Sequence, residues 1–170
     1  MLDPIYDIYK TSHRSKPGQH RQHVDLHVAA RKLYQSALLR GRLSRWVGRL
    51  LRRDRGLIDL NAVLQHRRIW SYHIDCAQPV VLQSILGSES QPQDFDRFFR
   101  PVNEATRQRW LAVAMHMMGG VVLPPVELVE IGGVYFVRDG HLRISVARAL
   151  GLKSINAQVV HLRLKQPAPW

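Results

Sequence analysis

The sequence predicts an α+β protein, in which a small mixed sheet with helices follows a basic, helical N-terminal segment. Three observations predict this class. The apolar run from Val134 to Val137 consists of the β-branched and aromatic residues that strands favour. Asp139-Gly140 follows it as a turn signal, and an apolar pattern of helical spacing then ends at Gly151. Positive charge gathers in residues 1–70, which hold 15 Lys and Arg against 5 Asp and Glu, whereas residues 71–170 hold 10 against 8.

The length and composition limit the classes of protein to consider. A chain of 170 residues amounts to about one domain, and we divide it into a basic helical segment, 1–68, and a folded domain, 69–170. Its net charge of +12 favours a polyanionic partner such as nucleic acid or an anionic membrane surface. The single cysteine, Cys76, excludes an internal disulfide framework and a cysteine-cluster zinc site. No apolar run reaches the length of a signal peptide or membrane span, so we expect a cytoplasmic protein.

The first residues, 1–24, are polar and contain Pro17-Gly18, which predicts a loose arm. His20, His23 and His27 would fall near one face if this part were helical, which is a geometry that a transition metal could use. No carboxylate or cysteine accompanies them at a matching interval. A solvated helix face is the simpler interpretation, and we assign no metal ligands.

Residues 26–55 predict a long amphipathic helix or a pair of helices interrupted near Gly41. Nine Lys and Arg and one acid lie between Arg31 and Arg55, which fits a solvated face or a surface that follows the phosphates of DNA or RNA. The same helix could lie on an anionic membrane or pair with a second copy in a homodimer. The candidate nucleic-acid-binding residues are Arg42, Arg45, Arg49, Arg52 and Arg53.

The middle of the chain alternates between short elements and turns. We expect a short helix over 57–64, a strand over 69–77, and a strand over 79–87 that turns into a helical turn closed by Gly87. A polar loop, 88–101, should be held to the core by its phenylalanine rings. Asn103 should cap the next helix, which Gly119-Gly120 ends.

The last part of the chain predicts a β-hairpin, a helix and a strand. Residues 126–131 alternate as a strand, and Gly132-Gly133 suits a two-residue hairpin turn before Val134. A helix over 141–150 and a strand over 155–160 follow.

The start of the helix at His141 is a candidate anion site. A helix that begins directly after a strand presents free N–H groups and the positive end of its dipole. Arg143 would add a planar charged fork, and His141 a group that titrates near neutral pH. The plain alternative is that Asp139 caps the helix while His141 and Arg143 lie in solvent.

The stretch LPPVELVEIGGVYFVRDGHLRISVARALG, with PVVLQSILGS before it and SINAQVV after it, resembles the ParB/sulfiredoxin-like superfamily, also called the ParB-like nuclease domain, over residues 76–163. In that superfamily Gly-x-x-Arg lies where nucleotide phosphates bind, which implies this role for Gly140 and Arg143. Partition proteins carry Glu-Arg between the two and bind CTP with magnesium, whereas His141-Leu142 stands here. Sulfiredoxins carry a catalytic cysteine at the position of His141, so their chemistry is not expected. Free-serine kinases of this fold share Asp-Gly-His before the arginine, which Asp139 and His141 match.

We therefore expect a nucleotide- or phosphate-binding ParB-like protein that associates with DNA through its basic helices. The resemblance implies a nucleoside di- or triphosphate with Mg²⁺ as cofactor, held by Gly140, His141 and Arg143. The alternative is an enzyme, a phosphotransferase, nucleotide hydrolase or nuclease, in which Asp139 and His141 act with Glu127 as general base. Glu130 lies on the same strand, and only one face of that strand can reach the site. A further alternative is a non-catalytic interaction module.

Overall fold

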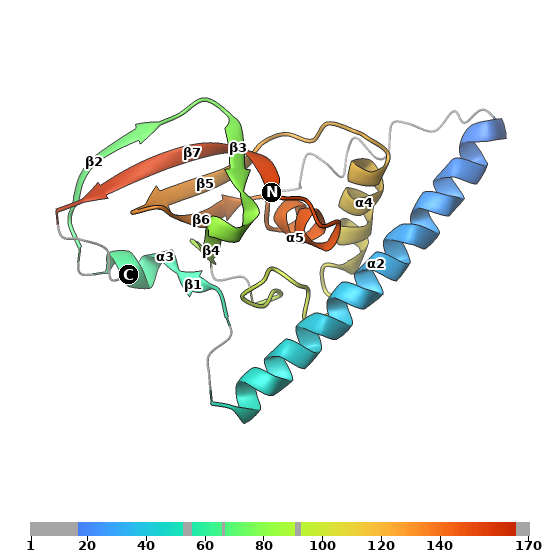
Figure 1. Ribbon diagram of the computed structural model, residues 1–170, viewed down its shortest axis with the longest axis horizontal. Helices are drawn as coiled ribbons and strands as arrows, with labels where there is room; N and C mark the ends of the chain where they lie inside the picture. Colours follow the sequence, from blue (N-terminus) through green and yellow to red (C-terminus); the bar gives the residue numbers. More distant parts are fainter. Residues whose placement is uncertain (1–16, 53–55, 66, 91–92, 166–170) are drawn as a thin grey trace.

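The computed structural model describes residues 17–52, 56–65, 67–90 and 93–165, with side chains described from His23 onward. Within these residues the chain forms an α+β fold in which one mixed sheet lies beside a group of helices, and the fold class predicted from the sequence is confirmed (Figure 1). The helix α5 (His141–Ala149) lies next to the sheet, and α4 (Arg107–Met118) and α2 (Pro17–Leu50) pack outside it.

Seven strands of the described residues form the sheet: β1 (Ile58–Asp59), β2 (Ile69–Ile74), β3 (Gln78–Val81), β4 (Ile85–Ser88), β5 (Val126–Ile131), β6 (Val134–Asp139) and β7 (Ser154–Leu164). The order is β1-β4-β6-β5-β7-β2, and β3 also pairs with β7. The pairs β1–β4, β4–β6 and β5–β7 are parallel, and the others are antiparallel. The predicted hairpin is confirmed, because Ile131 pairs with Val134 across Gly132 and Gly133, which have positive φ angles of 58° and 85°.

Two apolar clusters hold α2, α4 and α5 to the sheet. In the first, Ile144 and Ala147 of α5 pack on strand residues that include Val126 and Val137. In the second, Trp110 of α4 packs on Tyr34 of α2, with ring centroids 5.3 Å apart, and on Val146 of α5. The indole Nε1 of Trp110 donates to Ser145 Oγ at 2.8 Å, so its polar atom is also satisfied inside this core. The helix α5 therefore links the sheet to the outer helices.

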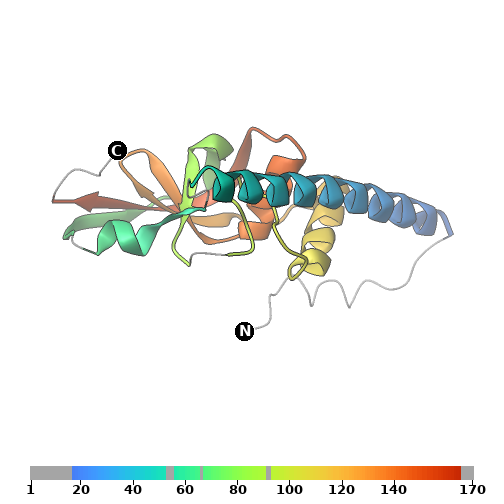
Figure 2. The same cartoon turned by 90° about the horizontal axis from the view of Figure 1, so that it is seen from below.

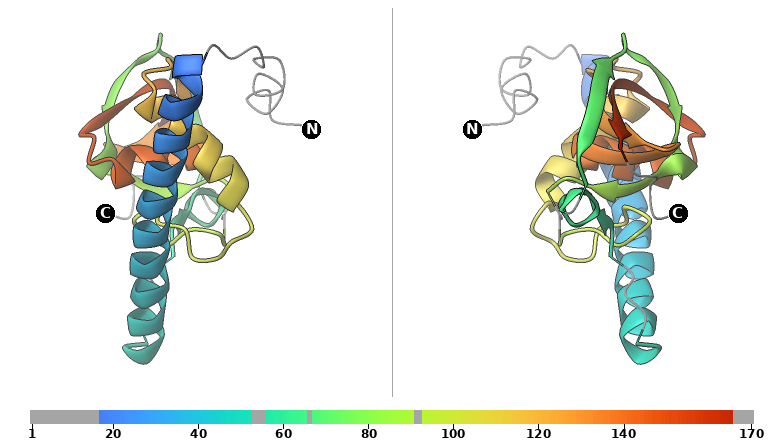
Figure 3. Two further views of the ribbon diagram at one scale, coloured as in Figure 1. Left: turned by 90° about the vertical axis from the view of Figure 1, so that its right-hand side faces the viewer. Right: turned by 90° about the vertical axis from the view of Figure 1, so that its left-hand side faces the viewer.

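The helix α2 runs as one unbroken rod along the body, and its N-terminal end extends past the other elements in Figure 2 and its C-terminal end in Figure 3. The predicted interruption at Gly41 is wrong. A β-carbon at Gly41 would lie 2.2 Å from the carbonyl oxygen of Pro101, so the glycine permits close packing of the helix on that loop. The predicted loose arm is also wrong for residues 17–24, because Pro17 begins the helix, a position that suits proline. Residues 1–16 lie outside the described part.

Other local features differ in detail from the predictions. Gly87 does not close a helical turn but lies in β4, where a β-carbon would lie 2.3 Å from the ring of Phe136. The short helix predicted from residue 57 is β1 followed by α3 (Leu60–Leu64), and the helical turn near residue 83 is η1 (Leu82–Ser84). Asn103 accepts from the Ala105 amide one turn before α4, whose N-cap is Thr106. The predicted boundary at residue 68 falls in the connection from α3 to β2.

None of the helices in the described residues combines the length and the apolar character needed to cross a bilayer.

Candidate functional site

The junction between β6 and α5 is the site that the sequence predicted. Gly140 is the N-cap of α5, with a positive φ of 99°. A β-carbon there would lie 2.5 Å from Cγ1 of Val126, so both the backbone angle and the packing require glycine. His141 and Arg143 follow in the first turn of the helix, as predicted.

Arg143 lies inside the protein, with its side chain only 8% exposed. Nη1 donates to the carbonyl oxygens of Pro124 and Pro125 at 2.6 and 3.1 Å, and Nη2 donates to the carboxylate of Asp139. The guanidinium thus ties α5 to the loop before β5 and to the end of β6. The plain alternative, a solvated Arg143 with Asp139 as the helix cap, is therefore not what the structure shows. Arg143 is buried, and Asp139 makes no capping hydrogen bond.

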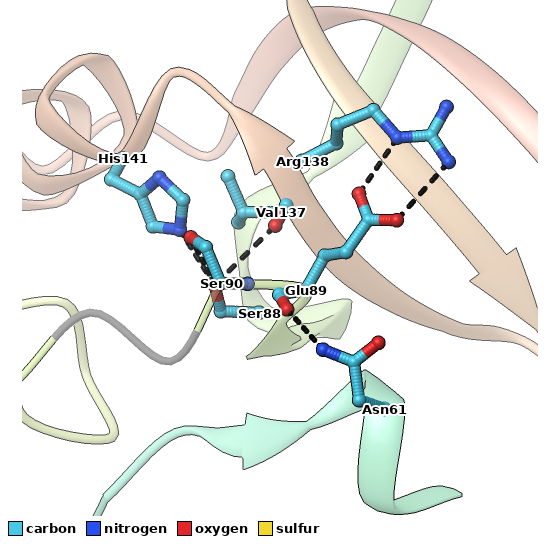
Figure 4. A network of polar contacts seen from close by, with 7 residues as sticks. All are labelled: Asn61, Ser88, Glu89, Ser90, Val137, Arg138 and His141. Atoms are coloured by element: carbon cyan, nitrogen blue, oxygen red, sulfur yellow. Dashed lines mark hydrogen bonds and ion pairs between the residues drawn. The ribbon is translucent and has the colours of Figure 1, made fainter. Parts of the chain in front are cut away.

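His141 also points inward, toward Ser88 at the end of β4 (Figure 4). Its Nε2 lies 2.7 Å from Ser88 Oγ, and its ring lies near those of Phe95 and Phe99, with centroids 6.4 and 6.2 Å away. Burial lowers the pKa of His141 to about 4, against a smaller opposing effect of Asp139. The imidazole is therefore neutral at physiological pH.

Ser88 is fully buried and has two ways to bond with this ring. Its hydroxyl can donate to His141 Nε2, or it can accept from Nε2 and direct its hydrogen toward the carbonyl of Val137, 3.4 Å away. Its oxygen also accepts from the Ser90 amide at 3.2 Å. A neutral imidazole beside a hydroxyl is the arrangement that activates a nucleophile, but here the buried pair braces β4 against α5.

The loop after β4 is held by an ion pair beside this network. Glu89 bonds to Arg138 of β6, with Oε2 2.7 Å from Nε, and this bond raises the pKa of the guanidinium (Figure 4). The backbone carbonyl of Glu89 accepts from Asn61 Nδ2 at 2.7 Å. The surface beside α5 therefore carries both signs of charge.

The two candidate carboxylates on β5 point to different places. Glu127 pairs in register with Asp139 on β6, and both are exposed near the start of α5. Glu130 instead accepts from the Gly133 amide and lies 2.9 Å from Nδ1 of His161. The structure thus brings Glu127, and not Glu130, beside Asp139.

The basic residues of α2 are exposed wherever their side chains are described. Arg42 lies 3.5 Å from the carboxylate of Glu104, and Arg45 Nη1 lies 3.5 Å from the carbonyl of Gln93. Arg49 lies in the last turn of α2, Arg52 follows the end of the helix, and Arg53 lies outside the described residues. Of the histidines on this helix, His23 is exposed, His27 is half-buried, and the side chain of His20 is not described.

An apolar row also lies exposed on α2, at spacings of four, three and four residues. Its members are Leu39, Leu43, Trp46 and Leu50, which are 67%, 60%, 62% and 68% exposed. A soluble helix normally buries such a row, so this one is a candidate contact for a partner.

A cavity of about 800 Å³ lies along the other end of α5, between α2, η1, the loop at 97–100 and the turn after α5. We call it the basic cavity, because the described residues that line it include no Asp or Glu and four cations: Arg40, Arg100, Arg148 and Lys153. Its apolar wall includes Leu82 and Phe98. The sequence did not predict it, because its lining comes from segments that lie far apart along the chain.

The four cations of the basic cavity differ in how they are held. Arg100 makes a two-point pair with the buried Asp96, at 2.8 and 2.7 Å. Arg148 donates to the carbonyls of Leu82 and Ile85, and burial lowers the pKa of its guanidinium. Arg40 and Lys153 are exposed and form no ion pair with any described residue. Two charges are therefore fixed and two remain available to a ligand.

Comparisons with known proteins give little further information. No protein-family model matches the sequence, and no curated protein matches it. Among solved structures, the fold is similar to that of sulfiredoxin from Arabidopsis thaliana, with 15% sequence identity and a TM-score of 0.39, over 50% of this chain and 84% of that one. At that level the similarity concerns the fold of half the chain.

Proposed function

We propose that the protein binds a nucleotide or another phosphate-bearing small molecule in the basic cavity. The observation that carries this proposal is a lining in which the described residues provide four cations and no carboxylate. Asp96 compensates the charge of Arg100, but Arg40 and Lys153 have no acidic partner among the described residues, and an anion between them would relieve their mutual repulsion.

The size and walls of the basic cavity fit such a ligand. Its volume of about 800 Å³ lies within the usual range of small-molecule sites. The ring of Phe98 and the side chain of Leu82 offer an apolar surface for a base, while Arg40 and Lys153 can turn toward phosphate oxygens.

The start of α5, where the sequence placed the phosphates, is the competing position for the same ligand. A phosphate at Gly140 would have to draw Arg143 away from three protein acceptors, two of them backbone carbonyls. Losing charge-assisted hydrogen bonds of this kind costs about 1.5–3 kcal/mol each, which favours the basic cavity.

A thermal-shift screen of ATP, ADP, GTP and CTP, each with and without Mg²⁺, tests the proposal. Binding at 100 times the dissociation constant stabilises a protein by about 2.7 kcal/mol, which is about 5–10 °C for a chain of this size. We expect such a shift in the wild type and its loss in the double variant Arg40→Ala with Lys153→Ala. The matched control removes two positive charges elsewhere, through Arg109→Ala with Arg163→Ala, and should keep the shift.

The enzyme alternative is supported by one observation, the register pair of Glu127 and Asp139 beside the start of α5. Two exposed carboxylates are typical ligands for Mg²⁺, and this alternative places the phosphates of the nucleotide at the start of α5 instead of in the basic cavity. Release of phosphate or nucleoside diphosphate during the screen, lost in Asp139→Asn, would support phosphotransfer or hydrolysis. Binding without turnover would support a binding module.

A second candidate function is association with DNA through α2, favoured by the charge of that helix. Residues 17–50 contain a single acid, Asp25, and the described basic side chains are all exposed. Each phosphate contact contributes affinity through counterion release, and its loss lowers the salt slope by about 0.9. We expect charge reversal at Arg45, Arg49 and Arg52 to weaken binding and flatten its dependence on salt. Three exposed arginines outside α2 serve as the matched control: Arg68, Arg109 and Arg163.

A further inference from the structure

Two histidines and an aspartate meet where β2 leaves the sheet, away from α2 and the basic cavity. His73 of β2 pairs in register with His161 of β7, and Asp75 follows at the end of β2. The backbone amide of Asp75 donates to the carbonyl of Val159 at 3.0 Å, which fixes the aspartate beside β7. One ligand atom from each of the three side chains lies within 4.8 Å of the others.

The distances between these atoms are close to those of ligands that share one ion. His161 Nε2 lies 3.0 Å from Asp75 Oδ2, and His73 Nε2 lies 3.7 Å from Asp75 Oδ1. Ligands at about 2.0–2.2 Å from a metal lie roughly 3 Å apart at neighbouring positions. His161 Nε2 is buried and makes no hydrogen bond with any described group, despite its short distance to the carboxylate. This nitrogen therefore has an unused lone pair or proton directed into the cluster.

Glu130 fixes the orientation of the His161 ring from the other side. Its Oε2 lies 2.9 Å from His161 Nδ1, and the carboxylate also accepts from the Gly133 amide in the hairpin turn. A carboxylate that holds the Nδ1–H of a histidine leaves Nε2 as an acceptor, which is the usual outer contact of a metal-binding histidine. Gln78 Nε2 similarly donates to Asp75 Oδ2 at 3.1 Å. Both the imidazole and the carboxylate are thus held in place by neighbours.

We propose that His73, Asp75 and His161 bind a first-row divalent transition metal such as Zn²⁺, with water at the remaining positions. Two imidazoles and one carboxylate are a ligand set for this class of ion, whereas Mg²⁺ and Ca²⁺ favour oxygen ligands alone. The rings of His73 and His161 are parallel, with centroids 4.5 Å apart and planes 4° apart, so one ring turns when the ion binds. His73 is the one that turns, because its side chain is 54% exposed while that of His161 is 19% exposed.

The test is a titration of the full chain with Co²⁺, followed by its visible absorption, and then displacement of Co²⁺ by Zn²⁺. We expect one equivalent bound, with affinity reduced at least tenfold by His73→Ala and by Asp75→Asn. Glu130→Gln should reduce it about 10–100-fold without removing a ligand, as expected for a positioning residue. Circular dichroism of the metal-free variants checks their folding. The variant of the third ligand, His161→Ala, is made as well. If it does not fold, His73→Ala, at an exposed position, and the conservative Asp75→Asn decide the result.

The histidines of α2 provide the matched control and the competing explanation. The double variant His23→Ala with His27→Ala should bind Co²⁺ as the wild type does. Loss of binding in this variant, with binding retained in His73→Ala and Asp75→Asn, would place the ion on α2 and overturn the proposal. A wild-type chain that binds no Co²⁺ or Zn²⁺ at millimolar concentration would overturn it as well.

Discussion

The substitution Gly41→Ala gives opposite predictions from local propensity and from the structure. In the interior of an exposed helix, alanine stabilises by about 1 kcal/mol relative to glycine. Here a β-carbon would lie 2.2 Å from the carbonyl oxygen of Pro101 and 3.3 Å from Cβ of Arg100. The first contact is with backbone, so the loop or the helix has to move by about 1 Å, and overpacking of this kind costs about 1–3 kcal/mol. Because a rigid carbonyl places the cost at the upper end, we expect a net loss of about 2 kcal/mol.

Differential scanning calorimetry measures this loss directly. About 2 kcal/mol corresponds to a fall in melting temperature of about 4–8 °C for a chain of this size. Gln35→Ala, on an exposed position of the same helix, is the control and should change the melting temperature by less than about 2 °C. A melting temperature that rises in Gly41→Ala would refute the packing of α2 on the Pro101 loop, and with it one wall of the basic cavity.

Three further predictions follow from the same contacts. The pKa of His141 is about 4 in the folded protein and 6.5 in the unfolded chain, so the unfolded chain takes up a proton first as the pH falls. The free energy of unfolding should therefore drop by about 3 kcal/mol from pH 6.5 to pH 4. Denaturant titrations should show this decrease in the wild type and a flatter pH dependence in His141→Gln. Arg143→Met leaves the carbonyls of Pro124 and Pro125 without their donor. The free energy of unfolding in urea should fall by about 2–4 kcal/mol, with or without nucleotide. An unchanged free energy of unfolding would show that the guanidinium is free. The exposed apolar row of α2 should cause self-association that sedimentation equilibrium detects and Leu43→Ser with Trp46→Ser removes; a wild type that remains monomeric at high concentration would contradict this.

The elements that the sequence predicted correctly depend on signals within a few residues. The hairpin of β5 and β6 is one example, because Gly132-Gly133 alone sets the turn that pairs Ile131 with Val134. The start of α5 is another, because Gly140 provides the positive φ at which the strand ends and the helix begins. Local conformational preference was sufficient at these positions.

The wrong predictions arose at glycines, because a glycine can be present for two different structural reasons. Gly41 weakens a helix by propensity, and the same missing side chain permits the close contact with Pro101, which is the cause that the structure shows. Gly87 similarly suits a helix end or a crowded strand, and it faces Phe136 in β4. Only the tertiary packing distinguishes these causes.

The functional groups that the sequence missed come from segments far apart in the chain. Ser88 meets His141 because β4 lies parallel to β6, and the spacing of these residues gives no sign of it. The cluster of Asp75 and His161 depends on the register of β2 and β7. A shift of this register by one residue would turn the side chains to opposite faces of the sheet. Residue types pointed to possible chemistry, but strand order and register decided which residues meet.

The central claim is that a phosphate-bearing ligand binds in the basic cavity, and isothermal titration calorimetry tests it most directly. The nucleotide with the largest thermal shift is titrated into the wild type, into Arg40→Ala with Lys153→Ala, and into Arg143→Met. Two lost charge-assisted contacts of about 1.5 kcal/mol each should weaken binding by about 100-fold or more in the double variant. Arg143→Met, if folded, should keep the wild-type dissociation constant. The same dissociation constant in the double variant and in the wild type, with binding lost in a folded Arg143→Met, would contradict the account and return the ligand to the start of α5.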